Sequence, residues 1–269
     1  MNKKNSREEK QFTNIDVVME KMSGAWDMRI KPYKKEFNYS YTEGVFPTVE
    51  LIENAPETVL RIITSSKGNN NTGVALLRQK CCALNIPIVE DDNTIARLCP
   101  KGSVMAVGVF SKHQQELDRT RNHIVLVNPA DMGNLGTILR TAAAFSFFDI
   151  AIIEPAADRF DPKTIRASMG AFFRERIHTY KTFEEYSASA GERDYYTFML
   201  KGRPLESFEP DFHSQKPCSL VFGNESSGLD DSYLEVGTPL CITHLDTVDS
   251  LNLTIAAGIA MHWKHHTFK

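Results

Sequence analysis

The stretch of sequence that decides the fold is DMGNLGTILRTA, residues Asp131–Ala142. It follows a short apolar run, His123–Val127, that predicts a strand, and it leads into Thr137–Phe148, which predicts a helix. A strand, a turn with an asparagine and two glycines, and a helix with an early arginine are typical of a phosphate or nucleotide site. Helix amino termini attract anions, and glycines let a ligand approach the backbone. This stretch alone does not choose among the nucleotide-binding folds.

Two later stretches narrow the choice. LVFGNESSG runs from Leu220 to Gly228, and DSLNLTIAAGI runs from Asp249 to Ile259. Taken in order with the first stretch, they resemble the three motifs of the SpoU (TrmH-like) family of RNA 2′-O-ribose methyltransferases, within the SPOUT superfamily. A further stretch, DPKTIRASMGA at Asp161–Ala171, also fits this family. The resemblance covers the C-terminal half of the chain.

The resemblance implies an α/β fold whose C-terminal domain, residues 123–269, is a SPOUT-type trefoil-knotted, mostly parallel sheet with helices on both faces. The apolar pattern predicts strands and helices in alternation. Strands are expected at His123–Val127, Ile150–Ile153, Arg176–Thr179, Tyr196–Leu200, Ser219–Phe222 and Leu240–Ile242. Helices are expected near Asn134–Phe147, Lys163–Ser168, Phe183–Ser189, Ser227–Leu234 and Leu251–Trp263. No GxGxxG follows a strand, which disfavours a nucleotide-dependent enzyme of Rossmann type.

The N-terminal half alternates in the same way and predicts a smaller α/β domain over residues 36–112. It resembles the substrate-binding domain often found ahead of SpoU catalytic domains, which implies that it presents RNA. The polar segment over residues 113–122 is the predicted linker. Residues 1–35 are expected to form a flexible or helical extension, with a short helix over Asn14–Met22. Their nine basic and five acidic side chains favour contact with phosphates, and a solvated polar tail is the alternative.

Composition bounds the class of protein. The chain has 269 residues, a net charge of −3 and 42% hydrophobic residues, which is enough for about two domains with a packed core. Because no apolar run is long enough for a membrane span and no signal peptide is present, we expect a cytoplasmic protein without a membrane partner. The five cysteines form no CxxC pair and are expected to be reduced. The histidines show no metal-ligand spacing, so no metal is expected.

The resemblance also implies roles for individual residues. The expected catalytic residues are Asn134, Arg140, Glu225, Ser250 and Asn252. The expected S-adenosylmethionine ligands are Leu200, Phe222, Gly223, Asn224, Gly228, Ile242, Leu251 and Asn252, and the expected RNA contacts are Arg140 and Arg166. Arg140 acts either as a base or as an electrostatic stabiliser, and because an unperturbed guanidinium is a poor base, stabilisation of the alkoxide and phosphate is the preferred interpretation.

Each of the other expected site residues has a structural alternative. Asn134 and Ser250 are also suitable helix N-caps. Glu225 has the alternative of a loop carboxylate, and Arg166 that of a structural ion pair. The chain departs from the family pattern at Met132, where proline is usual, and at Ile242–Asp246, ITHLD, where Ile-Pro-Met-x-Gly is usual.

The sequence therefore predicts a methyltransferase that acts on a ribose 2′-hydroxyl in structured RNA. Ribosomal RNA is preferred over transfer RNA, and the expected assembly is a homodimer with a site built from both chains. One alternative is a transfer-RNA 2′-O-methyltransferase. The other is a non-catalytic RNA-binding or assembly factor that keeps the knotted fold, an alternative that the altered loop at Thr243–Asp246 keeps open.

Overall fold

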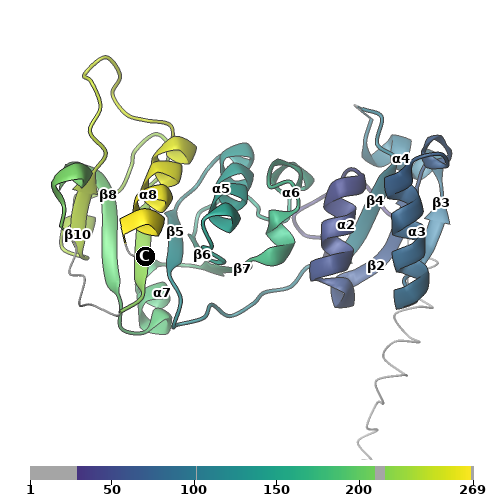
Figure 1. The fold of residues 1–269 in the computed structure, drawn as a ribbon, viewed down its shortest axis with the longest axis horizontal. Coiled ribbons are helices and arrows are strands. Elements are labelled where there is room, and N and C mark those ends of the chain that lie inside the picture. The colour runs from purple at the N-terminus through teal and green to yellow at the C-terminus, as the bar shows by residue number, and fades with distance from the viewer. Residues whose placement is uncertain (1–28, 101, 210–215, 268–269) are drawn as a thin grey trace, which may run out of the picture.

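The computed structural model describes residues 29–100, 102–209 and 216–267, and it forms two α/β units that lie side by side (Figure 1). The predicted helix at Asn14–Met22 lies outside these ranges. The C-terminal unit contains a six-stranded sheet in the order β10-β8-β9-β5-β6-β7, and all of its neighbouring strands are parallel. Its strands are β5 (His123–Val127), β6 (Asp149–Ile153), β7 (Arg176–Tyr180), β8 (Asp194–Pro204), β9 (Cys218–Phe222) and β10 (Thr238–Cys241).

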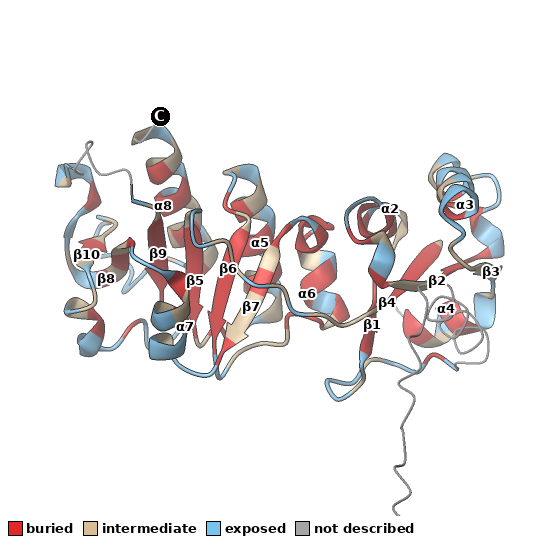
Figure 2. Ribbon diagram, turned by 90° about the horizontal axis from the view of Figure 1, so that it is seen from below, coloured by how far each residue is buried: buried red, intermediate tan, exposed pale blue. Residues whose placement is uncertain are grey.

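The two faces of this sheet follow from the alternation of apolar side chains along its strands. In β5, Ile124 and Leu126 belong to the core on one face, whereas Val125 and Val127 belong to the core on the other. The first core is covered by α5 (Met132–Ala144), α6 (Pro162–Ala167) and α8 (Leu253–Thr267), and the second by α7 (Phe183–Ala190). The central strands are buried throughout (Figure 2), so the predicted parallel sheet with helices on both faces is confirmed.

The order of the strands brings the motifs together. The chain lays down β5, β6 and β7 in sequence, then crosses to the other half of the sheet for β8, inserts β9 beside β5, and ends the sheet with β10. The segments after β5 and β9 therefore leave the same edge of the sheet from adjacent strands. Such a change of direction is where open α/β sheets place their ligands.

The N-terminal unit is a four-stranded mixed sheet in the order β1-β4-β2-β3. Its strands are β1 (Tyr39–Tyr41), β2 (Val59–Thr64), β3 (Ile88–Glu90) and β4 (Ala106–Ser111), and its helices are α2 (Val45–Asn54), α3 (Thr72–Leu84) and α4 (Asp92–Leu98). Leu77 of α3 packs on one face of the sheet, and Ile95 of α4 packs on the other.

An aromatic cluster joins the two units. The ring of Phe110 at the end of β4 lies 5.2–6.5 Å from the rings of Phe160, Phe172 and Phe173 of the C-terminal unit. The guanidinium of Arg174 also donates two hydrogen bonds, of 2.6 and 2.7 Å, to the Glu50 carboxylate of α2. The junction is thus both apolar and ionic.

Several predicted helix limits are wrong for identifiable reasons. Helix α5 begins at Met132, because Asp131 caps it by accepting a 2.7 Å hydrogen bond from the Asn134 backbone. Gly136 therefore lies inside the helix, where a Cβ would stand 2.4 Å from the Thr164 carbonyl oxygen of α6. The predicted helix at Ser227–Leu234 is replaced by a turn and a short 3-10 helix, Asp231–Leu234, which begins at an Asp230 cap.

Candidate functional site

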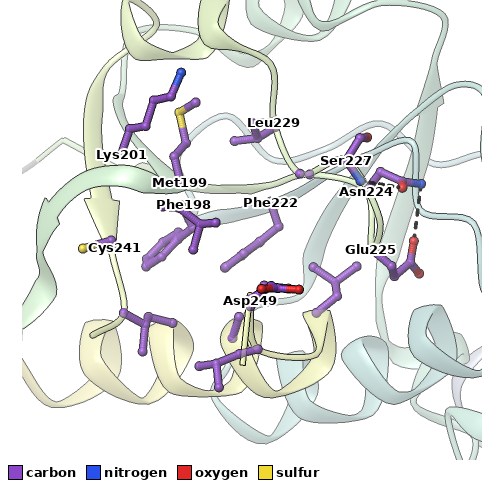
Figure 3. Close-up of a pocket in the computed structure, with 18 of the residues that line it drawn as sticks. Phe198, Met199, Lys201, Phe222, Asn224, Glu225, Ser227, Leu229, Cys241 and Asp249 are labelled. Atoms are coloured by element: carbon purple, nitrogen blue, oxygen red, sulfur yellow. Dashed lines mark hydrogen bonds between the residues drawn. The ribbon is translucent and has the colours of Figure 1, made fainter. Parts of the chain in front are cut away.

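A pocket of about 440 Å³ opens at the carboxyl edge of the six-stranded sheet, beside β8, β9 and β10. Its walls are β8, the loop that follows β9, and the segment between β10 and α8 (Figure 3). Seven of the eight predicted cofactor ligands line this one pocket, together with two of the predicted catalytic residues. They are Leu200, Phe222, Gly223, Asn224, Gly228, Ile242, Leu251, Glu225 and Ser250.

The wall after β9 is a turn held by backbone and side-chain hydrogen bonds. The backbone N–H of Asn224 donates to the Gly228 carbonyl at 3.2 Å, and the N–H of Gly228 donates back to the Asn224 carbonyl at 2.9 Å. The side-chain oxygen of Asn224 accepts from the Ser226 N–H at 2.8 Å, and its amide donates to the Asn128 carbonyl at 2.7 Å. This turn is therefore preorganised and tied to the end of β5.

Glycine is required at two points of this turn for different reasons. A Cβ on Gly223 would lie 2.1 Å from the Gly228 carbonyl carbon, because the two backbones pass each other in contact. Gly228 has open space around its Cα, but its φ of +68° is a left-handed conformation that other residues rarely adopt.

Glu225 connects the pocket to the start of α5. Its carboxylate accepts hydrogen bonds from the backbone N–H groups of Ala130 at 3.0 Å and Asp131 at 3.2 Å, and from the Asn134 side-chain amide at 3.2 Å. Burial alone would raise the pKa of Glu225, but these hydrogen bonds outweigh it and lower the pKa below its ordinary value. The carboxylate therefore positions two of the motif stretches against each other.

Strand β8 supplies an aromatic wall through a break in its pairing. Its register with β10 jumps from Thr197, opposite Pro239, to Arg203, opposite Leu240. Four of the residues in between line the pocket: Phe198, Met199, Leu200 and Lys201. The Phe198 ring stacks on Phe222 with centroids 4.8 Å apart, so the pocket has an apolar floor, as Figure 3 shows.

The third wall begins α8. Asn252 caps this helix, because its side-chain oxygen accepts a 2.8 Å hydrogen bond from the Thr254 N–H. The cap is therefore Asn252 and not the alternative, Ser250, and α8 begins at Leu253, two residues later than expected. Ser250 and Leu251 line the pocket, whereas Asn252 does not. Asn252 follows the pocket residue Leu251 in the chain, but its side chain caps the helix and does not line the pocket.

Arg140 and Asn134 stand outside the pocket lining. Asn134 is connected to the pocket through its hydrogen bond to Glu225. The helix N-cap, which was the alternative role of Asn134, is Asp131. Arg140 lies on the exposed side of α5, and its guanidinium makes no hydrogen bond or ion pair with another described residue. On the neighbouring helix α8, Gly258 faces Thr141, the residue after Arg140.

Arg166 lies at the junction of the two units. Its guanidinium pairs with the Glu43 carboxylate of the N-terminal unit at 2.8 Å, which matches the structural alternative. The same stretch packs Gly170 against Glu50, where a Cβ would stand 2.5 Å from the Glu50 Cγ. The stretch that contains Arg166 therefore holds the N-terminal unit in place.

Sequence reasoning missed several side chains of the pocket. Phe198, Met199, Lys201, Leu229, Asp231, Cys241 and Asp249 line it and were not expected there. Ligands bind beyond the carboxyl ends of parallel strands, and this rule would have predicted the missed pocket residues that lie next to the ends of β8 and β10. Nothing in the sequence signals the shift of register that exposes Phe198 and Lys201.

Two negative findings concern the described ranges only. Within residues 29–100, 102–209 and 216–267, no group of three or more His, Cys, Asp or Glu side chains is placed to hold a metal ion. In the same part of the chain, every helix is too short or too polar to cross a membrane.

Comparison with known proteins supports the interpretation of the motifs. The model of the SpoU rRNA Methylase family matches residues 121–262, which is more than half of the chain. An uncharacterized tRNA/rRNA methyltransferase of Synechocystis sp. is 30% identical over 167 residues, which is 61% of this chain and 60% of that protein. The 23S rRNA (guanosine(2553)-2′-O)-methyltransferase RlmP of Bacillus subtilis is 26% identical over 152 residues, which is 55% of this chain and 60% of RlmP.

Solved structures share the fold over almost the whole chain. The AdoMet-bound rRNA methyltransferase from Sinorhizobium meliloti aligns with a TM-score of 0.71 and 23% identity, over 93% of this chain and 95% of that one. The SpoU methyltransferase AviRb from Streptomyces viridochromogenes aligns with a TM-score of 0.71 and 18% identity, over 93% and 96%. The chain spans about 60% of the length of the curated relatives named above. It belongs to the SpoU rRNA Methylase family.

Proposed function

We propose that this protein is an S-adenosylmethionine-dependent RNA methyltransferase that modifies a ribose 2′-hydroxyl, with ribosomal RNA as the preferred substrate. The observation that carries the proposal is the convergence of the β9 loop, β8 and the start of α8 on one pocket that reaches α5 through Glu225. The names of the relatives include both ribosomal and transfer RNA methyltransferases. The family description favours ribosomal RNA.

The pocket fits the cofactor in size and in charge. Its volume of about 440 Å³ suits a ligand of this size. The stacked Phe198 and Phe222 rings offer an apolar surface, and the carboxylates of Glu225 and Asp249 favour a positively charged ligand, whereas Asp231 is paired with Lys201 of the same lining. When bound, S-adenosylmethionine would supply a methyl group on a sulfonium, whose sulfur would leave as a neutral thioether when the ribose oxygen takes the methyl group.

The protein contributes alignment and electrostatic stabilisation to this reaction. Methyl transfer forms a C–O bond, breaks the C–S bond, and releases the hydroxyl proton to water. A positioned guanidinium stabilises the negative charge that develops on the oxygen and also binds the adjacent phosphate. Arg140 is the residue that we assign to this role. Glu225 is a positioning residue, because its carboxylate holds the start of the helix that carries Arg140.

We propose further that the active assembly is a homodimer in which Arg140 of one copy serves the pocket of the other. Arg140 does not line the pocket of its own chain. The next residue, Thr141, lies beside α8, whose exposed side chains include Ile255 and Ile259, 55% and 39% exposed. An apolar strip next to an unengaged arginine is suited to contact with a second copy.

Mixing two inactive variants tests the shared site. Arg140→Ala removes the guanidinium, and Leu200→Arg places a cation in the cofactor pocket at a side chain that is 68% exposed. If the site is shared across a two-fold dimer, the mixed dimer regains one intact site and an equimolar mixture regains about a quarter of wild-type activity. A mixture that stays inactive contradicts the shared site. If each chain built its own site, every chain in the mixture would carry one defect in that site, and mixing could not restore activity.

The catalytic assignment has a test of its own. Arg140→Ala should abolish methyl transfer to RNA while leaving S-adenosylmethionine binding and thermal stability unchanged. Arg121→Ala is the matched control, because Arg121 is an exposed arginine before β5, with a surface ion pair to Asp118. Mapping of 2′-O-methyl groups in total RNA, with and without the protein, identifies the substrate. Unchanged turnover in Arg140→Ala contradicts the role given to Arg140.

The second candidate function, an RNA-binding or assembly factor without turnover, is favoured by one feature. The loop after β10 has Thr243 and Asp246 where the family pattern has proline and glycine, and this loop forms a wall of the pocket. Calorimetry separates the two candidates. Absence of S-adenosylmethionine binding at high cofactor concentration favours the factor, and binding favours the enzyme.

A further inference from the structure

A second pocket lies at the junction of the two units, where the proposed function assigns no residue. It has a volume of about 360 Å³ and lies beyond the carboxyl ends of β6 and β7. Glu154 follows β6 directly, and Lys181 follows β7 directly. The opposite wall comes from the N-terminal side of the chain, through Lys35 and Lys112. We call it the junction pocket.

The charge of the junction pocket is positive. Its lining includes Lys35, Lys112, Lys181 and Arg159, against the two carboxylates of Glu154 and Asp158. Asp158 is already engaged, since it accepts hydrogen bonds from the Tyr33 hydroxyl and from the Phe160 N–H. Among the described residues, the ammonium groups of Lys35 and Lys181 form no ion pair. Two lysines are therefore available to an anion.

Two further cations are fixed by the fold. Arg159 is only 6% exposed, and its guanidinium donates to the backbone carbonyls of Ile177 and His113 and lies 4.6 Å from the Phe160 ring centroid. Lys112 donates to the Lys35 carbonyl at 2.8 Å and lies over the ring of Tyr33. A buried cation held by carbonyls and not by a carboxylate creates a positive potential that favours an anion nearby.

The junction pocket and the cofactor pocket lie at the same carboxyl edge of one sheet. Ile152 and Phe160 of the junction pocket belong to the core that also contains Phe222 and Leu253 of the cofactor pocket. In the sheet, β9 is followed by β5, β6 and β7. At about 4.8 Å per strand, β6 and β7 lie about 10–15 Å from β9. A single strand of RNA can span that distance.

Resting on the proposed function, we propose that the junction pocket binds a backbone phosphate of the RNA substrate. Lys35, Lys112 and Lys181 contact the phosphate oxygens, and Arg159 supports them from beneath. The contact sets the register of the RNA strand on the carboxyl edge of the sheet, because phosphate contacts position a strand without reading its sequence. The N-terminal unit thus contributes to substrate binding through the junction and not only through its own sheet.

The test compares two lysine pairs with equal changes in charge. The double variant Lys35→Gln/Lys181→Gln removes the two available cations, whereas Lys112 is left in place because it packs on two rings. The control, Lys67→Gln/Lys80→Gln, removes two lysines of the N-terminal unit that do not line the junction pocket. The probe is a fluorescein-labelled hairpin RNA with a single-stranded tail, and its binding is followed by anisotropy over a series of KCl concentrations.

The expected result is a weaker dependence on salt in the junction variant alone. Each lost phosphate contact lowers the slope of log K against log salt concentration by about 0.7, so the double variant, which weakens contact with one phosphate, should lose up to about 0.7. Glu154→Gln should act in the opposite direction and tighten RNA binding, since it removes the exposed carboxylate of the pocket. A slope equal to that of the control pair, or a Glu154→Gln variant that binds more weakly, overturns the proposal.

Two further measurements separate the possible failures. Calorimetry with S-adenosylmethionine should give the same affinity for the wild type and for the junction variant. If the cofactor binds and the junction variant binds RNA as the wild type does, the phosphate site is wrong and the proposed function stands. If the lysines matter but the cofactor never binds, the enzyme function fails and the RNA site stands. Saturable binding of inorganic phosphate with an affinity equal to that of the RNA would assign the pocket to a free anion and overturn the strand assignment.

Discussion

The two edges of the six-stranded sheet use polar side chains in opposite ways. At the amino edge, His123, Tyr186 and Ser219 form a buried chain of hydrogen bonds, 2.9 and 2.5 Å long, that Arg193 extends at 3.1 Å. At the carboxyl edge, the turn after β9 and the loop before α8 surround an open pocket. Polar groups that are satisfied within the protein hold the strands together, and polar groups that line a cavity are available to a ligand.

The amino edge also fixes the segment that connects the two units. The Asp118 backbone N–H donates to the Asp149 carboxylate at 2.8 Å, and the Asp118 carbonyl contacts the His123 ring at 2.9 Å. The carbonyls of Arg119 and Arg121 accept from Arg193. The segment therefore runs along the sheet as part of its structure, below the strands in Figure 1. Changes at this edge should affect stability alone, whereas changes at the other edge should also affect ligand binding.

The largest effect on stability is expected for Asp149→Ala. The Asp149 carboxylate is fully buried and accepts two hydrogen bonds from Arg176, at 2.7 and 2.5 Å, besides that from Asp118. Breaking a buried ion pair costs about 3–5 kcal/mol of the free energy of unfolding, measured by urea denaturation. Asp231→Ala is the matched control at the carboxyl edge, because the Asp231 pair with Lys201 is exposed and contributes less than about 1 kcal/mol. Equal losses in the two variants would contradict the division between the edges.

A pH effect of about 3 kcal/mol is expected from the amino edge. Burial, with a smaller contribution from Arg193, lowers the pKa of His123 to about 4 from 6.5. The folded protein keeps this ring neutral while the unfolded chain protonates it, so stability falls as the pH decreases from 6.5 to 4; a shift of this size is worth about 3 kcal/mol. His123→Gln removes this dependence on pH in urea titrations. A wild type whose stability is flat between pH 6.5 and 4 contradicts the assignment.

At the carboxyl edge, Gly223→Ala should cost about 1–3 kcal/mol of stability and abolish S-adenosylmethionine binding. The added methyl group meets backbone atoms at 2.1–2.3 Å, and backbone cannot move aside without opening the turn. In Gly228→Ala the added methyl group meets no neighbouring atom. The variant should lose only about 1–2 kcal/mol of stability, because alanine is strained in the left-handed conformation at φ +68°. Calorimetry of both variants measures the difference. Retained cofactor binding in Gly223→Ala would show that the turn is not a wall of the cofactor site.

Glu225→Gln tests the connection between the pocket and α5. The carboxylate accepts hydrogen bonds from Ala130, Asp131 and Asn134, besides a longer one from the Asn224 amide, and replacement by an amide weakens them. A loss of about 1.5–3 kcal/mol is expected at neutral pH, since hydrogen bonds to charged groups are strong. The pKa of Glu225 is lowered in the fold, so this stability is present above pH 4.5 and is lost as the pH falls below it. The variant should lack this acid-dependent loss, and a variant with the wild-type pH profile contradicts the role of Glu225.

The sequence located the carboxyl edge better than the amino edge, for a physical reason. Gly223 and Glu225 are recognisable because a ligand site requires particular residue types at particular positions in a short stretch. The hydrogen-bonded chain from His123 to Arg193 joins residues 70 positions apart in the sequence, so no local pattern signals it. Strands of the buried sheet, such as His123–Val127, were also predictable, because continuous apolar runs mark them.

The predictions that went wrong concern where helices begin. A cap depends on one side-chain hydrogen bond, and two adjacent polar residues such as Ser250 and Asn252 satisfy the same pattern. Arg140 lies outside the pocket because of the order of β5 and β9 in the sheet. The spacing of residues along the chain does not predict that order. The resemblance to the family, and not the residue pattern, supplied the expectation of a second copy.

The smallest effect on stability is expected in the loop between β10 and α8, which is the least constrained wall of the pocket. Leu245 is 79% exposed, and the residues from Leu245 to Ser250 are all exposed. Leu245→Ala should therefore change the free energy of unfolding by less than about 0.5 kcal/mol. Its effect should lie in the bound state, because in the proposed site S-adenosylmethionine would contact this loop and order it. Limited proteolysis checks this: the cofactor should protect residues 243–250 from cleavage in the wild type, whereas the turn at Asn224–Gly228 should resist cleavage with or without it. If both segments are cut equally in the free protein, the contrast between a preorganised wall and a loosely held one is wrong.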